Sequence, residues 1–209
     1  HIDPAKDTVL FIDPGFPVQR NQVNILGIRS ESFDIYEYRG EKLAAKLESY
    51  FGPGVSRAVM RDKRVELMDA YVAQNGVELK PGIRELLDYL EEKGIARAIT
   101  SSSPLDRIQE HLSFHGLDTR FNALCSGHDV PNGKPAPDIY LHGAASLGLK
   151  PEECLALEDS PAGIESAFRA GCFPVIIPDL DQPSEETLSR CFAKANSLAD
   201  IIDLLEELC

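Results

Sequence analysis

The sequence has no long apolar run, few cations for its length and no paired-cysteine motif. No stretch approaches the roughly 18 apolar residues that a membrane span needs, so we expect no membrane association. Its 21 Lys and Arg against 34 Asp and Glu give a formal net charge of -13. Non-specific binding to a phosphate backbone requires the opposite balance. The composition therefore argues against membrane proteins and nucleic-acid-binding proteins.

The five cysteines are odd in number and widely spaced, with no C-x-x-C pair and no Cys/His cluster at zinc spacing. This usage is typical of reduced, mostly buried thiols, so we expect a cytoplasmic protein. No signal peptide is visible, and the chain opens on His rather than Met. We interpret residues 1–4 as a cloning remnant, which leaves the native N-terminus open.

The 209 residues, 43% of them apolar, suffice for one sizeable core or for one domain with a small insert. Short, continuous apolar runs predict buried parallel strands at residues 8–13, 95–100, 121–125, 154–157 and 173–177. Apolar residues at helical spacing predict helices over 83–90, 105–112, 137–148, 161–171 and 198–208, with Ser197 as the N-cap of the last. This alternation predicts an α/β fold with a doubly wound parallel sheet.

The pattern differs between the first strand and residue 81. Residues 38–50 and 56–74 carry apolar faces at helical spacing, without a strand signal. The sequence therefore predicts a small helical insert directly after the first strand.

Polar residues gather where the predicted strands end, which in an open parallel sheet is the functional edge. Asp13 ends the first strand, Ser101–Ser103 end the second, Lys134 follows the third, and Glu158 and Asp159 end the fourth. Lysine and hydroxyl groups suit phosphoryl oxygens, and adjacent carboxylates suit Mg²⁺. Together they predict a phosphoryl-transfer site with a carboxylate nucleophile.

The order and spacing of five motifs resemble the haloacid dehalogenase superfamily, in its β-phosphoglucomutase-like and phosphoglycolate-phosphatase-like branch. The motifs are A-I-T-S-S-S at 98–103, G-K-P-A-P-D-I-Y at 133–140, L-A-L-E-D-S-P-A-G-I at 155–164, A-x-x-A-G at 167–171 and K-P-G-I-R-E-L-L-D-Y-L at 80–90. The resemblance covers nearly the whole chain after residue 20. It implies an α/β core of residues 1–15 and 78–209, with residues 16–77 as a helical cap that selects substrate.

The resemblance also implies roles for single residues. Ser101, with Ser102 beside it, matches the hydroxyls that bind the transferring phosphoryl group, and Lys134 matches the cation that neutralises its charge. Arg29 lies near the position at which relatives carry a cap arginine that grips the substrate phosphate.

The implied metal site holds Mg²⁺ with Asp13, which is also the nucleophile, and with Glu158 and Asp159, which bind the ion directly or through water. The implied function is a Mg²⁺-dependent phosphatase or phosphomutase that acts on a small phosphate ester, such as a sugar phosphate, through an aspartyl-phosphate. The expected partner is this small molecule, with no nucleic acid and no membrane, and the expected state is a monomer or weak homo-oligomer.

The first motif departs from the family pattern D-x-D-G, and three registers stay open. In one, Asp13 is the nucleophile and Gly15 stands where the second Asp is expected. In another, Gly15 aligns with the family glycine and neither acid is present. In the third, Asp7 is the acid/base, Ala5 stands in place of the nucleophile, and Asp13 is a downstream acid.

About one helix of chain is also missing beside this motif, by comparison with relatives. Either residues are absent from the sequence, or the first strand is altered or wrongly assigned, or the protein is an impaired homologue that binds a phosphorylated metabolite or a partner. A haloacid dehalogenase, which needs one Asp and no metal, is a lower-ranked alternative because Glu158 and Asp159 favour Mg²⁺. Two simpler interpretations also stand: Glu158 and Asp159 as an acidic cap of the helix at Pro161, and Ser102 or Ser103 as the N-cap of the helix after Pro104.

Overall fold

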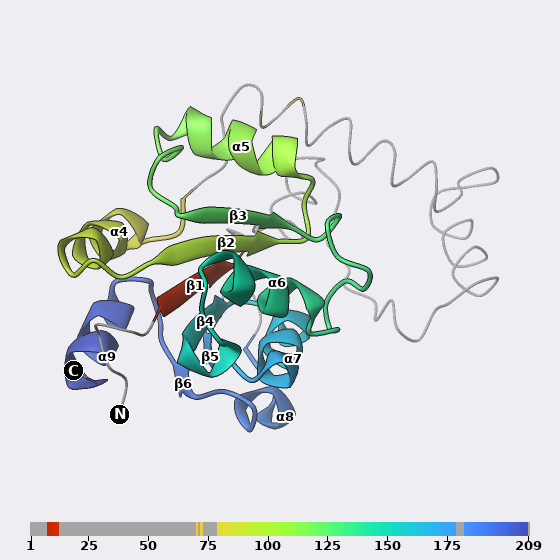
Figure 1. Cartoon of the computed structure of the whole chain (residues 1–209). Coiled ribbons are helices and arrows are strands. Elements are labelled where there is room, and N and C mark those ends of the chain that lie inside the picture. Colours follow the sequence, from red (N-terminus) through yellow and green to blue (C-terminus); the bar gives the residue numbers. More distant parts are fainter. Residues whose placement is uncertain (1–7, 13–69, 71, 73–78, 179–181, 209) are drawn as a thin grey trace, which may run out of the picture. The chain divides into compact units, whose positions relative to one another are not determined.

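A computed structural model describes residues 8–12, 70, 72, 79–178 and 182–208 (Figure 1). The chain divides into two compact units, His1–Phe16 with Glu78–Cys209 and Pro17–Val77. The two expected helices of residues 16–77, Arg29 and Asp13 lie outside the described residues, apart from residues 70 and 72, which are helical.

The core of the first unit is a parallel sheet with the strand order β3-β2-β1-β4-β5-β6. The strands are β1 Thr8–Ile12, β2 Arg97–Ser101, β3 Ala123–Ser126, β4 Cys154–Glu158, β5 Phe173–Ile176 and β6 Ala193–Lys194. The five predicted strands are confirmed, to within two residues at their described ends. β6 was not predicted, because two residues are too few to carry a hydrophobic period.

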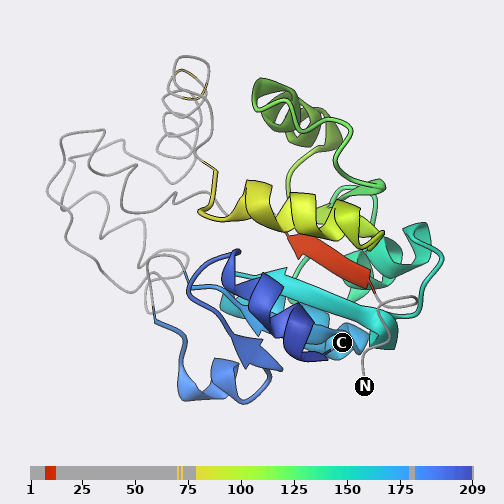
Figure 2. The same ribbon diagram turned by 90° about the vertical axis from the view of Figure 1, so that its left-hand side faces the viewer.

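Helices cover both faces of the sheet. The long ones are α4 Ile83–Glu92, α5 Leu105–Phe114, α6 Asp138–Ser146, α7 Pro161–Ala170 and α9 Asp200–Leu208, and all five were predicted. The 3₁₀ turn η1 Pro151–Glu153 and the short helix α8 Glu185–Leu188 were not. Helices α6 and α7 pack together on one face, and α4 and α9 pack together on the other (Figures 1 and 2). None of the described helices is long and apolar enough to cross a membrane.

The position of the strands in the core explains why their sequences are continuous apolar runs. Every residue of β2 and β4 is buried, since helices cover both sides of these central strands. Helix α4 contributes three completely buried leucines, Leu86, Leu87 and Leu90. Burying a side chain of this size stabilises the fold by about 2 kcal/mol before entropy is counted.

The segment that leads into α4 is fixed against the start of α9. The Leu198 amide donates to the Pro81 carbonyl at 3.2 Å. Gly82 has φ 84, and a Cβ added there would lie 2.3 Å from the Ala199 nitrogen. Only glycine fits this contact, so the backbone from residue 80 onward starts from a fixed position.

Helix starts confirm one predicted cap and correct another. The Ser197 hydroxyl accepts from the Asp200 amide at 3.4 Å, as predicted for the start of α9. The prediction that Ser102 or Ser103 caps α5 is wrong. Pro104, with ψ 150, takes the N-cap position, and no side chain caps this helix. The serines precede that position, so they belong to the strand end rather than to the helix.

Candidate active site

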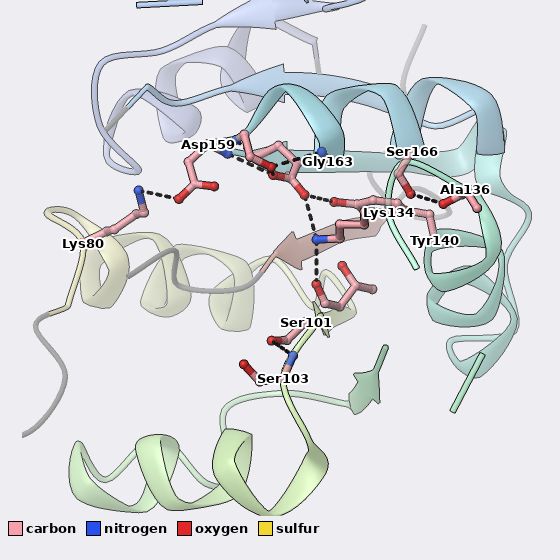
Figure 3. Close-up of polar contacts among 12 residues, drawn as sticks. Lys80, Ser101, Ser103, Lys134, Ala136, Tyr140, Asp159, Gly163 and Ser166 are labelled. Carbon is pink, nitrogen blue, oxygen red and sulfur yellow. Dashed lines mark hydrogen bonds and ion pairs between the residues drawn. The ribbon is translucent and has the colours of Figure 1, made fainter. Parts of the chain in front are cut away.

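The carboxyl ends of β1, β2 and β4 lie side by side. Ile12 is in register with Thr100 of β2, and Phe11 is in register with Leu157 of β4. Ser101 and Glu158, the last residues of β2 and β4, therefore stand at the same edge of the sheet (Figure 3).

Lys134 forms a buried ion pair with Glu158. Its Nζ atom lies 2.8 Å from Glu158 Oε1, and the two side chains are 9% and 1% exposed. The same ammonium donates to the Thr100 carbonyl at 3.3 Å. Two of its three N–H groups are thus used by described residues, and the third has no hydrogen-bond acceptor among them. The loop that carries Lys134 is held to α7, because Ser166 Oγ donates to the Ala136 carbonyl at 2.6 Å.

Tyr140 is a third member of this cluster, and sequence reasoning assigned it no role. Its hydroxyl donates to Glu158 Oε1 at 2.7 Å. Its ring centroid lies 5.3 Å from Lys134 Nζ, within the range of a cation–π contact. Complete burial and the Glu158 charge raise the pKa of the Tyr140 hydroxyl well above 10, so it stays a proton donor. The only sequence feature that pointed to Tyr140 as a site residue was its place at the end of the motif G-K-P-A-P-D-I-Y.

The second oxygen of Glu158 rests on the first turn of α7. Oε2 accepts from the amides of Asp159 at 3.1 Å and Ser160 at 3.2 Å, and from Ser160 Oγ at 3.0 Å. Ser160, rather than either acid, is the N-cap of α7, since its hydroxyl accepts from the Gly163 amide. The position of a helix N-terminus favours a negative charge here.

Gly163 leaves room for this carboxylate. A Cβ added at Gly163 would lie 1.7 Å from the Glu158 carboxyl carbon. The absence of a side chain at residue 163 is therefore part of how Glu158 is held.

Asp159 is paired with Lys80, a contact that sequence reasoning also missed. Asp159 Oδ2 lies 3.1 Å from Lys80 Nζ, with 17% and 19% of the side chains exposed. Burial raises the pKa of the Asp159 carboxyl, and the Lys80 charge opposes that shift without overcoming it. Asp159 Oδ1 has no hydrogen-bond partner among the described residues, so one oxygen of this acid is available.

The serine segment forms the other side of the cluster. Ser101 is completely buried, and its Oγ accepts from the Ser103 amide at 3.0 Å, which leaves the hydroxyl proton for another acceptor. Ser102 is exposed at the same edge. Of the predicted site residues, the structure thus brings together Ser101, Lys134, Glu158 and Asp159.

Comparison with known proteins decides the family. The family model of haloacid dehalogenase-like hydrolases matches residues 13–171. The chain belongs to the haloacid dehalogenase-like hydrolases. The resemblance that the motifs indicated is thereby confirmed.

Two curated relatives give the scale of the similarity. Hexitol phosphatase B of Escherichia coli (strain K12) is 32% identical over 123 residues, which are 59% of this chain and 55% of that protein. Protein CbbY of Rhodobacter capsulatus is 35% identical over 163 residues, which are 75% of this chain and 70% of that protein. The match thus spans only about half of hexitol phosphatase B.

Solved structures confirm the fold class. A haloacid dehalogenase family hydrolase from Deinococcus radiodurans R1, with bound phosphate and sodium, is 27% identical, with a TM-score of 0.73 and coverage of 98% of this chain and 97% of that one. CbbY from Rhodobacter sphaeroides, in complex with phosphate, is 23% identical, with a TM-score of 0.67 and coverage of 94% and 96%. Both have the Rossmann-like α/β core that the sequence predicted.

The described acids fit the Mg²⁺ expected of this family unequally. Asp159 fits as a ligand, because one of its carboxylate oxygens has no partner among the described residues and Mg²⁺ prefers such oxygens. Glu158 does not fit as a direct ligand in this arrangement, because protein donors already occupy both of its oxygens. No three His, Cys, Asp or Glu side chains gather as a metal site among the described residues. The third expected acid, Asp13, lies outside them.

Proposed function

We propose that this chain is a Mg²⁺-dependent phosphatase or phosphomutase that acts on a small phosphate ester, with sugar phosphates as the substrate class. The observation that carries the proposal is the buried Lys134–Glu158 pair beside Ser101 and Asp159, at the edge where β2 and β4 end. This group offers a fixed cation and a hydroxyl donor to one phosphoryl group, and a carboxylate to the metal ion. The names of the relatives, a hexitol phosphatase among them, support the substrate class.

In the proposed reaction, Asp13 is the nucleophile. A bond forms between an Asp13 carboxylate oxygen and phosphorus while the ester P–O bond breaks, and the leaving alkoxide takes a proton from solvent. Water, or a sugar hydroxyl in a phosphomutase, then attacks the phosphorus of the aspartyl-phosphate. The bond between phosphorus and the Asp13 oxygen breaks, the Asp13 carboxylate is released, and the proton of the attacking O–H group passes to solvent. When bound, Mg²⁺ would neutralise charge on the phosphoryl oxygens.

The described residues have separate tasks in this scheme. Lys134 donates its remaining N–H to a phosphoryl oxygen, and Ser101 donates its hydroxyl proton to another. Glu158 is a positioning residue, because it holds Lys134 through a 2.8 Å ion pair. Asp159 holds the metal ion with its available oxygen.

The proposal also covers the residues outside the described part. Residues 16–77 form the cap that selects substrate and excludes water, and Arg29 grips the substrate phosphate. With Lys134 and Mg²⁺, Arg29 makes a local positive site within a chain of net charge -13, which would otherwise repel an anionic substrate. A monomer or weak homo-oligomer in the cytoplasm remains our prediction.

A phosphate-release assay on a panel of hexitol and sugar phosphates tests the function. We expect Mg²⁺-dependent release, which Asp13→Asn lowers by at least about a thousandfold because the nucleophile is lost. Asp203→Asn, on the exposed side of α9, is the matched control and should leave the rate unchanged. Mass spectrometry with beryllofluoride and Mg²⁺ should map the adduct to Asp13.

Two other results would contradict the proposal. A folded protein without phosphate release across the panel would favour the impaired homologue, to which the departure at Gly15 points. Metal-independent chloride release from 2-chloro acids would favour a haloacid dehalogenase.

A further inference from the structure

Two acids stand side by side at the end of β4, and each has its own lysine. Glu158 is paired with Lys134, and Asp159 is paired with Lys80 (Figure 3). The first lysine comes from the loop before α6. The second lies two residues after Glu78, where the first unit resumes.

The two pairs differ in how firmly they are held. Glu158 accepts five hydrogen bonds, from Lys134, Tyr140, the Asp159 amide and both the amide and hydroxyl of Ser160. Among the described residues, the Asp159 carboxylate has only the 3.1 Å contact with Lys80, and both of these side chains are partly exposed. The Lys80–Asp159 pair is therefore the one that an incoming ion can open.

The base of the Lys80 side chain is nevertheless fixed. The next two residues are attached to the start of α9, through the Pro81 carbonyl and the close approach of Gly82 to Ala199. The backbone of Lys80 is thus rigid, whereas its four-carbon side chain is flexible and can move the ammonium group away from Asp159.

We propose that Lys80 is a displaceable counter-cation of Asp159, which holds this acid in the metal-free protein and competes with the divalent ion for it. The inference rests on the proposed function, in which Asp159 holds Mg²⁺. An ammonium 3.1 Å from Oδ2 repels a second cation and occupies one carboxylate oxygen, so Lys80 lowers Mg²⁺ affinity. In return, it neutralises a partly buried acid that stands beside a second one.

Calorimetric titration of Mg²⁺ into chelator-stripped protein tests this. We expect Lys80→Gln to bind Mg²⁺ about fivefold more tightly than the native protein, because a partly buried opposing charge has been removed. In EDTA, the same variant should unfold at a lower temperature, because Asp159 has lost its partner. Lys80→Arg keeps the charge and should retain the weaker affinity, while Asp159→Asn should lose binding.

Lys93→Gln is the matched control for metal binding. It removes an exposed lysine that follows α4 and lies 5.4 Å from the centroid of the Tyr89 ring, and it should leave the Kd unchanged. Acylation of the native protein by an N-hydroxysuccinimide ester, read by mass spectrometry, is a second measurement that needs no variant. Mg²⁺ should increase labelling of Lys80 severalfold and leave Lys93 unchanged.

The outcomes separate this inference from the proposed function. An unchanged or weaker Kd in Lys80→Gln, or Lys80 labelling that Mg²⁺ does not increase, overturns the inference even where the native protein turns over phosphate esters. Mg²⁺ binding without turnover overturns the function, and the comparison of Kd values still decides the inference. A native protein that binds no Mg²⁺ overturns both.

Discussion

Glu158 is almost completely buried, yet its charge is fully compensated by its neighbours. Removing one partner of a buried ion pair commonly costs 3–5 kcal/mol, because the other charge is left without water or a counter-charge. Here the compensation comes from four residues, and the carboxylate sits where α7 begins. The geometry of the candidate site therefore depends on keeping this one side chain in place.

Gly163→Ala tests that dependence. The added Cβ would overlap the Glu158 carboxyl group, at 1.7 Å from its carbon, so Glu158 must leave its donors. We expect the free energy of unfolding to fall by about 2 to 4 kcal/mol and phosphate-ester turnover to be lost. Urea unfolding followed by circular dichroism measures the first effect.

Gly133→Ala is the control for this substitution. A Cβ at residue 133 would meet no atom within 4 Å, so stability should change by less than about 0.5 kcal/mol. If Gly163→Ala were as stable as native protein, the close packing of Glu158 on α7 would be incorrect.

At this scale, sequence reasoning found residues but not their contacts. Ser101, Lys134, Glu158 and Asp159 were predicted to gather, because strand ends and motif order point to one edge. The contacts of Tyr140 and Lys80 could not be predicted. Tyr140 lies 18 residues from Glu158, and Lys80 lies 79 residues from Asp159, so no local period relates either pair.

Among the elements, α9 shows a reciprocal start that links stability to pH. Ser197 Oγ donates to Asp200 Oδ1 at 2.8 Å, and the Ser197 and Asn196 amides donate to Oδ2 at 3.2 and 2.9 Å. The Ser197 hydroxyl is the main cause that holds the pKa of Asp200 below its ordinary value of 3.8. The resulting stability is present above that value and is lost as the pH falls through the lower pKa of the folded chain.

Ser197→Ala should reduce this pH dependence. Without the hydroxyl, the pKa of Asp200 moves back toward 3.8, and the variant is less stable than native protein by more at about pH 6 than at about pH 2.5. Urea unfolding at both pH values measures the difference. Ser189→Ala is the control, since the exposed Ser189 hydroxyl donates to a backbone carbonyl and not to a carboxylate. An equal loss at both pH values would contradict the role of Asp200.

The elements that sequence reasoning missed share one property, which is shortness. The strand β6, the helix α8 and the turn η1 have two, four and three residues. None is long enough to show the period of its own structure. The prediction of the α5 N-cap was wrong for another reason. A serine-rich run favours a serine at this position, but Pro104 occupies it.

On the scale of the whole molecule, the cysteines report the integrity of the fold. Cys125, Cys154 and Cys172 are buried free thiols, as the composition predicted, and Cys191 is partly buried. Burial, with a contribution from Cys154, raises the pKa of the Cys172 thiol to about 12. Only about one Cys172 thiol in ten thousand would be ionised at pH 8, so its intrinsic reactivity is very low.

Iodoacetamide labelling should therefore follow global unfolding. In native protein at pH 8, Cys172 should label at the rate of unfolding, while Cys191 labels earlier and serves as the internal reference. In about 6 M guanidinium, both should label at once. Fast labelling of Cys172 in native protein, read by mass spectrometry, would contradict the burial of this thiol at the start of β5.

The central place of β1 has a consequence for how the protein is assembled. Val9 pairs with Arg97, 88 residues later, and Thr8 pairs with Cys154, 146 residues later. During synthesis, β1 is made before β2 and β4, the two strands with which it pairs. Until they are made, its backbone N–H and C=O groups are unpaired and can bind to other chains. Until it is enclosed, β2 with β3 and β4 with β5 and β6 have no common ladder. The residues next to the proposed nucleophile thus come from the strand that is separated from its neighbours by the longest stretches of chain.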